Sequence, residues 1–188
     1  MYMRSRQQRI FPDILAFYKE NEEYGIFSNF ARHENFLYIF PENLRKPGYP
    51  EYAICNYTEK CIMLMKALLM DDKIRFKLIL ESKTPYETKQ LGKQVRPWDQ
   101  EKWDYYIKQI AYDVIYQKIT KVPGLIKVLL NTRDRIIVEA SPHDNIWGIG
   151  LDKNGPIHDC RDWKGQNILG NALMEVREKL KSDLSVCF

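Results

Sequence analysis

The 188-residue sequence has few cysteines and lacks a long apolar run. Its four cysteines form no Cys-x-x-Cys pair, so the usual spacing of a structural zinc site is missing. No stretch approaches the roughly 20 apolar residues that a membrane-spanning helix needs, and no secretory signal is recognisable at the start. We therefore expect a cytoplasmic protein with reduced thiols and no membrane partner.

An excess of one charge is also missing. Lysine and arginine total 29 against 25 aspartate and glutamate, which gives a net charge of +4. This is well short of a dedicated nucleic-acid binder, but it suits a small phosphorylated ligand. Three basic residues near the start, Arg4, Arg6 and Arg9, either contact a phosphate backbone or are simply solvated. His143, His158 and Cys160 fit no zinc signature, so we expect no metal site.

The first part of the chain reads as an extension followed by short strands. Residues 1–20 are expected to be an N-terminal extension or a first helix, because apolar residues such as Ile14 and Tyr18 recur at helical spacing. Aromatic-rich segments predict strands over Tyr24–Phe30 and Asn35–Phe40. Prolines and a glycine then predict a loop over Pro41–Glu51.

Helices dominate the remainder of the sequence. Asn56 and Glu59 have the spacing of a capping box ahead of the apolar run Cys61–Met70. The stretch Arg135–Ala140 is the best strand, because three β-branched residues stand together in it. Further helices are expected over Lys73–Leu80, after the Thr84-Pro85 cap, after the Asp99 cap up to Pro123, over Leu125–Leu130 and over Asn167–Ser182. The predicted fold is one α+β domain over residues 21–188, predominantly helical with a few short strands.

Glu59 and Lys66 lie on one predicted helix, seven residues apart. Seven residues are nearly two turns, so both side chains share a face about 10 Å apart along the axis. A carboxylate and an amine at this separation suit acid–base or imine chemistry on a ligand of sugar size. From spacing alone, a solvated glutamate and a lysine with its amine in water are the simpler interpretation.

Two loops carry further candidates. After the best strand come Asp144, Trp147 and Gly148. They offer a ligand an acid, a stacking surface and a close approach to the backbone. An ordinary turn with Trp147 packed in the core is an equal alternative. Trp163 and Asn167 precede the last helix, whose free amides favour an anion, although a plain cap and hydrophobic staple also explain them.

In their order along the chain, these segments resemble the NADAR family of YbiA-like N-glycosidases. The resemblance runs from about Tyr24 to Leu180, and its most specific stretch is Trp163–Gly170. The other matching pieces are Ile26–Phe30 with Asn29, Tyr57–Glu59, Met63, Lys66, Ala67, Thr84-Pro85, Leu91–Lys93, Trp103, Leu130, Thr132, Val138–Ala140, Asp144, Trp147-Gly148, Gly150 and Leu173–Arg177.

The resemblance implies cleavage of the N-glycosidic bond between ribose C1 and an amino group on a pyrimidine- or purine-like ring. It implies a Schiff base on Lys66, with Glu59 and Asp144 in proton transfer, and neither metal nor cofactor. The implied substrate is a ribosylamino-pyrimidine phosphate of the riboflavin pathway. Its implied contacts are stacking on Trp103 or Trp147 and phosphate binding by amides near Asn167, with Asn29 and Gly148 beside them.

Two alternatives remain open from the sequence. The first is removal of ADP-ribose from guanine in DNA, in which nucleic acid enters only as the modified substrate. The second is a non-catalytic module that binds ADP-ribose or NAD, against which the retention of Lys66 and Glu59 argues. Lys60, Met63 and Lys93 stand where many family members have other residues, so the departures concern the substrate more than the chemistry.

Overall fold

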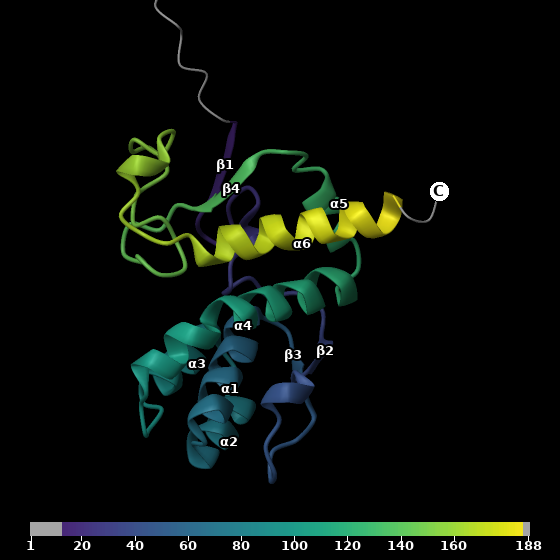
Figure 1. The fold of residues 1–188 in the computed structure, drawn as a ribbon, viewed down its shortest axis with the longest axis vertical. Helices are drawn as coiled ribbons and strands as arrows, with labels where there is room; N and C mark the ends of the chain where they lie inside the picture. Colours follow the sequence, from purple (N-terminus) through teal and green to yellow (C-terminus); the bar gives the residue numbers. More distant parts are fainter. Residues whose placement is uncertain (1–12, 186–188) are drawn as a thin grey trace, which may run out of the picture.

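The computed structural model describes residues 13–185 of the chain. Two long helices, α4 and α6, lie side by side across the middle of the molecule and run in roughly the same direction (Figure 1). The helices α1, α2 and α3 and the strands β2 and β3 lie on the α4 side, and β1 and β4 lie on the α6 side. In chain order the elements are β1 (Ile14–Phe17), η1 (Gly25–Phe27), β2 (Phe36–Ile39), η2 (Glu42–Leu44), β3 (Tyr52–Cys55), α1 (Thr58–Met70), α2 (Lys73–Glu81), α3 (Pro85–Lys93), α4 (Gln100–Lys121), α5 (Leu125–Leu130), β4 (Ile136–Glu139), η3 (Cys160–Asp162) and α6 (Ile168–Ser185).

The predicted α+β class, predominantly helical with a few short strands, is confirmed. The strands form two separate two-stranded sheets. β1 pairs with β4 in parallel, with Ile14 opposite Ile136, and β2 pairs with β3 antiparallel, with Phe36 opposite Cys55. The strands predicted over 35–40 and 135–140 are therefore present, whereas β3 was not predicted. Its residues follow a proline-rich loop and show their alternation only against β2.

The helix caps read from the sequence are largely confirmed. The Thr84 hydroxyl accepts a hydrogen bond from the Glu87 N–H at 3.2 Å, and the Asp99 carboxylate accepts one from the Lys102 N–H at 2.9 Å. Each bond satisfies an amide that the first helical turn leaves without a partner. The predicted apolar stripes of the two long helices are also buried: Trp103, Ile107, Ile110 and Val114 on α4, and Leu169, Leu173, Val176 and Leu180 on α6.

Two predictions for the N-terminal part are wrong. Ile14–Phe17 is a strand, not helix, because pairing with β4 outweighs the helical spacing of its apolar residues; residues 1–12 lie outside the described part of the chain. The stretch 24–30 is not a strand but a left-handed Tyr24 followed by a 3₁₀ turn, η1. Gly25 allows this turn to lie against the preceding loop, because a Cβ there would come within 2.6 Å of the Glu20 carbonyl oxygen.

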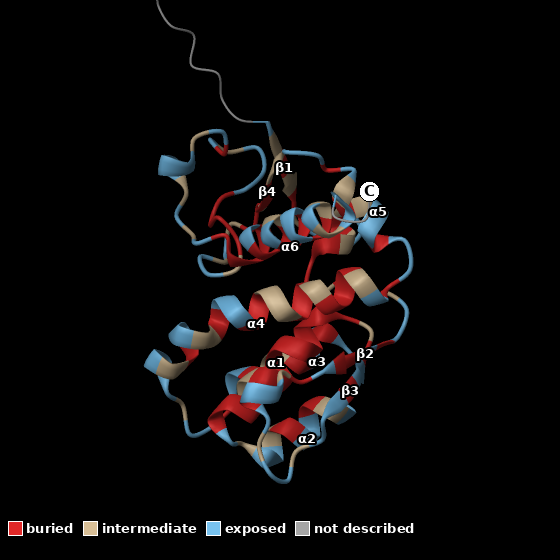
Figure 2. Cartoon of the chain, turned by 45° about the vertical axis from the view of Figure 1, so that its right-hand side comes forward, coloured by how far each residue is buried: buried red, intermediate tan, exposed pale blue. Residues whose placement is uncertain are grey.

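The capping box predicted at Asn56 and Glu59 is also wrong. The residue before α1 is Tyr57, and no side chain caps the helix. The Glu59 N–H instead donates to the Asn29 carbonyl oxygen at 2.9 Å, so a loop distant in sequence satisfies the first turn. Every residue of α1 except Lys66 is buried, which makes this helix the centre of the larger core (Figure 2).

Between residues 13 and 185, no helix is long and apolar enough to cross a membrane.

Candidate active site

A cavity of about 220 Å³ opens beside α1, and six of the eight residues singled out from the sequence line it. Its walls come from the loop after η1, from α1, α3 and α4, and from the end of β4 with the loop that follows. The lining residues are Asn29, Phe30, Glu59, Met63, Lys66, Lys89, Lys93, Trp103, Glu139, Asp144, Ile146 and Trp147.

Glu59 stands in the first turn of α1 and is only 5% exposed. Asn29 fixes this turn, because its carbonyl accepts the Glu59 N–H and its side-chain oxygen accepts the Thr58 hydroxyl at 2.9 Å. Burial raises the pKa of Glu59 to about 7, although Lys89 and Lys66 oppose the rise. At neutral pH this carboxyl group can therefore both give and accept a proton.

Lys66 lies farther along α1 and is half-buried. Its Nζ is 4.3 Å from the ring centroid of Trp98 and 5.6 Å from that of Trp103, so aromatic faces flank the amine. Within the described part of the chain, no carboxylate lies within ion-pair distance of it. Burial lowers the pKa of Lys66, while Glu59 partly restores it. A lowered pKa increases the share of neutral amine, which is the nucleophilic form.

Asp144 and Trp147 belong to a tight turn at the cavity edge. The Asp144 Oδ1 atom accepts hydrogen bonds from the Ile146 N–H at 3.0 Å and the Trp147 N–H at 2.8 Å. This arrangement is a side-chain-closed turn, which holds the half-buried Trp147 against the cavity. Trp103 lies on the wall formed by α4.

Glu139, at the end of β4, begins the candidate segment that the sequence indicates after the best strand, but it was not among the eight predicted site residues. Its Oε2 atom is buried and has no hydrogen-bond partner among the described residues. Burial, together with the neighbouring Asp144 and Glu59, raises the pKa of Glu139 to about 8, while Lys89 opposes the rise. The signal in the sequence was a carboxylate closing an otherwise apolar strand, but its direction depends on the parallel pairing of β4 with β1.

Lys89 and Lys93 were also missed as site residues. They stand one turn apart on α3 and both line the cavity. The Lys89 Nζ lies 5.4 Å from the ring centroid of Phe30. The sequence predicted the start of this helix correctly, but the face that α3 turns to the cavity follows from its packing on α1. Gly92 is in contact with Met63 in that packing.

The structure does not bring Asn167 and Gly148 into the cavity. The buried Asn167 side chain bridges β4, since its Nδ2 donates to the Ile137 carbonyl at 2.9 Å and its Oδ1 accepts the Glu139 N–H at 3.1 Å. Gly148 is needed for close packing, because a Cβ would lie 2.7 Å from the Glu139 carbonyl oxygen.

The predicted anion site before α6 is already occupied by the protein itself. The N–H groups of Asn167, Ile168 and Leu169 donate to the carbonyl oxygens of Gly148, Ile146 and Trp147. These amides hold the turn beside the cavity and are not free for a phosphate. The amines of Lys89 and Lys93 on α3, with that of Lys66, are the cationic groups that line the cavity.

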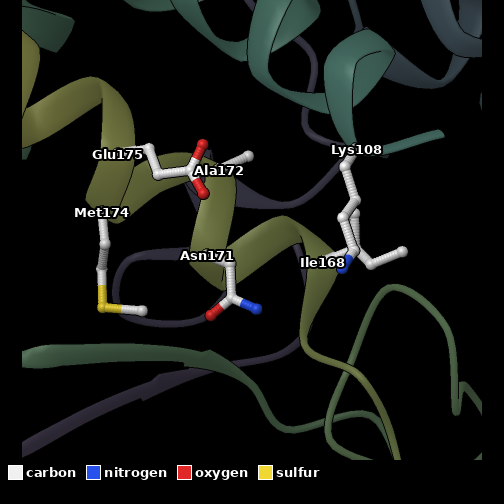
Figure 3. Close-up of a pocket in the computed structure, with 6 residues that line it drawn as sticks. All are labelled: Lys108, Ile168, Asn171, Ala172, Met174 and Glu175. Carbon is white, nitrogen blue, oxygen red and sulfur yellow. The ribbon is translucent and has the colours of Figure 1, made fainter. Parts of the chain in front are cut away.

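A second cavity of about 240 Å³ lies between α4 and α6, away from these residues (Figure 3). Lys108 of α4 faces α6 across it. It is lined by three apolar and three polar residues and contains none of the eight predicted site residues: Lys108, Ile168, Asn171, Ala172, Met174 and Glu175. In residues 13–185, no group of three or more histidine, cysteine, aspartate or glutamate side chains could hold a metal ion.

Similarity to known proteins agrees with this geometry. The chain is 34% identical over 166 residues to a protein of Acanthamoeba polyphaga mimivirus named as an N-glycosidase, covering 85% of this chain and 98% of that protein. It is 28% identical over 172 residues to the chloroplastic riboflavin biosynthesis protein PYRR of Zea mays, covering 89% of this chain and 25% of that protein.

The fold is shared with a solved structure. The NMR structure of the Escherichia coli protein YbiA superimposes with a TM-score of 0.68 at 23% identity, covering 95% of this chain and 91% of that one. The NADAR domain matches residues 16–181, which include all the cavity-lining residues. The chain therefore belongs to the NADAR domain family.

Proposed function

We propose that the protein hydrolyses the N-glycosidic bond between C1 of a phosphorylated ribose and an amino group on a pyrimidine- or purine-like ring. The class of the reaction is that of its mimivirus relative, which is named an N-glycosidase. The observation that carries the proposal is the Lys66 amine, placed between aromatic faces in a cavity that also holds buried carboxyl groups. A pocket that only binds ADP-ribose needs no such amine.

The chemistry begins with Lys66. Its neutral amine attacks ribose C1 while the ring amino group departs, and opening of the ribose gives an imine between C1 and Nζ. Water then adds to C1 and the bond to Nζ breaks, which releases the phosphorylated ribose and restores the amine. Glu59, with its pKa of about 7, exchanges protons with the ribose oxygens during these steps. Dividing base departure and water addition lowers the barrier of each step.

The remaining groups suit the two ends of the substrate. Trp103 and Trp147 offer flat faces to the heterocycle, and Lys89 and Lys93 offer two amines to a phosphate. The maize relative is named a riboflavin biosynthesis protein, which supports a ribosylamino-pyrimidine phosphate as the substrate.

A neighbouring cavity favours a second candidate substrate. It has a volume of about 280 Å³ and shares Phe30, Lys89, Glu139 and Asp144 with the first cavity. Binding sites for small molecules usually measure about 300–1,000 Å³, which only the two cavities together reach. The added room suits an ADP-ribosyl group on guanine, as an alternative to a ribosyl monophosphate.

The test incubates the purified protein with a ribosylamino-pyrimidine phosphate and, separately, with DNA that carries ADP-ribosyl-guanine. Borohydride is added to trap the imine, and mass spectrometry locates it. Lys66→Ala is expected to abolish both turnover and trapping. The matched control Lys108→Ala removes an exposed lysine of the second cavity and is expected to retain both. Product release by Lys66→Ala at the wild-type rate would exclude the imine mechanism.

A further inference from the structure

We propose that Glu139, rather than Asp144, is the acid that protonates the departing nitrogen, and that Asp144 is a positioning residue. This inference rests on the proposed N-glycosidase function and assigns a catalytic residue to it. The geometric basis is the contrast between the two carboxyl groups, both of which line the same cavity.

Asp144 is engaged by its own turn. Its Oδ1 atom accepts the N–H groups of both Ile146 and Trp147, so the side chain is held toward the backbone of the loop. These bonds occupy Oδ1 and orient Trp147, and turning that atom toward a substrate would leave two amides without partners. Its geometry therefore fits a structural role in shaping the cavity wall.

Glu139 is in the opposite situation. Its backbone is fixed on both sides, because its N–H donates to the Asn167 side chain and its carbonyl accepts the Ile149 N–H at 2.9 Å. The side chain nevertheless leaves Oε2 buried without a partner. A buried polar atom without a hydrogen bond is destabilising, so a rigid strand that holds one against a cavity keeps it for a ligand.

The position of Glu139 between the two cavities also supports its role as the acid. It lines the cavity with Lys66 and also the adjoining one with Ser141 and His143. A group at this junction can reach a bond held in the first cavity while water or the leaving group passes through the second. Lys89 and Asp144 share the junction.

The groups that face Glu139 keep its carboxyl group protonated near neutral pH. Burial is the main cause, and Asp144 of the same loop and Glu59 of α1 add to it, whereas Lys89 of α3 opposes it. The resulting pKa of about 8 leaves a proton available for transfer at pH 7. Departure of the amine consumes this proton and converts Glu139 to the carboxylate.

Protons and electrons balance over one catalytic cycle. The Nζ lone pair of Lys66 forms the bond to C1, the C1–N bond breaks with its electron pair remaining on the ring amino nitrogen, and the Glu139 proton moves to that nitrogen. A proton passes from Nζ to the ring oxygen as the bond between C1 and that oxygen breaks with its electron pair on the oxygen, which gives the protonated imine. Water then adds to C1 and gives a proton to the Glu139 carboxylate. The new C1 hydroxyl group passes its proton to Nζ as the C1–Nζ bond breaks with its electron pair on Nζ, which returns the neutral Lys66 amine and releases the phosphorylated ribose as its aldehyde.

Two substrates separate an acid from a structural residue. One is the ribosylamino-pyrimidine phosphate, and the other is a nitrophenyl riboside phosphate, whose leaving group departs without a proton. In the first turnover, Glu139→Gln is expected to release the pyrimidine about 10²–10⁴-fold more slowly and to release nitrophenol from the second substrate at nearly the wild-type rate. Its pH–rate profile should lose the decline of kcat that the wild type shows as pH rises through about 8.

Asp144→Asn and Lys66→Ala complete the comparison. Asp144→Asn is expected to slow cleavage of both substrates by the same factor and to keep the decline of kcat at alkaline pH, because it alters the cavity wall and leaves the acid Glu139 in place. Lys66→Ala is expected to cleave neither substrate. Thermal unfolding of Glu139→Gln shows whether it folds; we expect it to be at least as stable as the wild type at alkaline pH, since a buried carboxyl group is removed.

Each contrary result has a distinct meaning. If folded Glu139→Gln loses both substrates equally, or keeps the alkaline decline, Glu139 is not the acid although the N-glycosidase function stands. If the wild type cleaves no ribosylamine at all, the proposed function fails and the role of Glu139 fails with it.

Discussion

Buried polar groups are treated differently in the core and in the cavity. In the core, the ammonium group of Lys118 is fully buried and donates to the carbonyl oxygens of Ile26 at 2.6 Å and Ser28 at 3.3 Å. Lys60 likewise donates to the Ser82 carbonyl at 2.7 Å. In the cavity, and within residues 13–185, Glu139 Oε2 has no hydrogen-bond partner and the Lys66 amine lies against the aromatic faces of Trp98 and Trp103.

The difference separates Lys118 and Lys60, whose hydrogen bonds the fold satisfies, from Glu139 and Lys66, which line the cavity; outside the cavity, His33, Tyr49 and Arg75 also have a buried atom without a hydrogen-bond partner among the described residues. A satisfied buried group stabilises one conformation, whereas an unsatisfied one costs free energy and persists only where the surrounding structure is rigid. The two regions are connected, because the carbonyls held by Lys118 precede Asn29, whose own carbonyl holds the first turn of the helix carrying Glu59. The well-paired core thus supports the unpaired cavity.

The largest effect that tests this contrast is expected at Glu59. Glu59→Gln keeps the shape of the side chain but removes its proton exchange, so kcat should fall by about 10²–10⁴-fold. Steady-state kinetics at neutral pH measures it. Glu178→Gln removes an exposed carboxylate of α6 and is the matched control, with wild-type kcat expected. A wild-type kcat in Glu59→Gln would remove this residue from the chemistry.

The pH dependence of stability is the next largest effect. Glu59 and Glu139 bind protons more tightly in the folded protein, with pKa values of about 7 and 8 against an ordinary value of 4.5. Their contribution is therefore complete below pH 4.5 and is lost as pH rises through 7 to 8. The free energy of unfolding from urea titrations should fall from pH 5 to 9 by a few kcal/mol, roughly 2–4.

A double variant isolates this contribution. Glu59→Gln/Glu139→Gln should remove the decline, leaving the opposite trend of Lys118, whose pKa burial lowers to about 7 and whose stability contribution grows as pH rises above that value. An equal decline in the wild type and the double variant would show that the cavity carboxyl groups are not its source.

Arg177 offers the corresponding test in the core. It is 4% exposed, and its Nη1 donates to the Thr132 hydroxyl oxygen at 2.9 Å and to the Arg135 carbonyl at 2.8 Å. Arg177→Met leaves both acceptors unpaired and should cost about 2 kcal/mol in denaturant unfolding, with kcat unchanged. Lys181→Met, which removes only exposed ion pairs, should cost less than about 1 kcal/mol. A fall in kcat at unchanged stability would contradict the division between core and cavity.

The smallest effect is expected at the boundary between them. A Cβ at Gly92 would touch the side chain of Met63, which lines the cavity. Because that side chain is flexible, Gly92→Ala should push it into the cavity at a cost of about 1 kcal/mol, seen as a raised KM with little change in kcat. Adding Met63→Ala should restore KM, and Met63→Ala alone is the control. Unchanged KM in Gly92→Ala would mean that Met63 moves away from the cavity.

Local patterns predicted most of the helical structure. The caps at Thr84 and Asp99 and the apolar stripe of α4 act within a few residues of one another, so they can be read without the rest of the fold. The spacing of Glu59 and Lys66 likewise placed both on one helix face, and both line the cavity. The predictions were wrong where contacts with distant segments decide the local structure, as in β1 and at the start of α1.

The sequence by itself determined the α+β class, the helices and the chemical types available on α1, because helical periodicity and capping are local. Only the tertiary structure decided that Glu139 and the α3 lysines join that face, and that the amides before α6 are used by the turn beside it. The physical reason is that contacts between distant segments decide which side of a strand faces the cavity and which partners the amides of a loop find. The parallel pairing of β4 with β1 sets the direction of Glu139, and the carbonyl groups of Ile146–Gly148 accept the amides before α6.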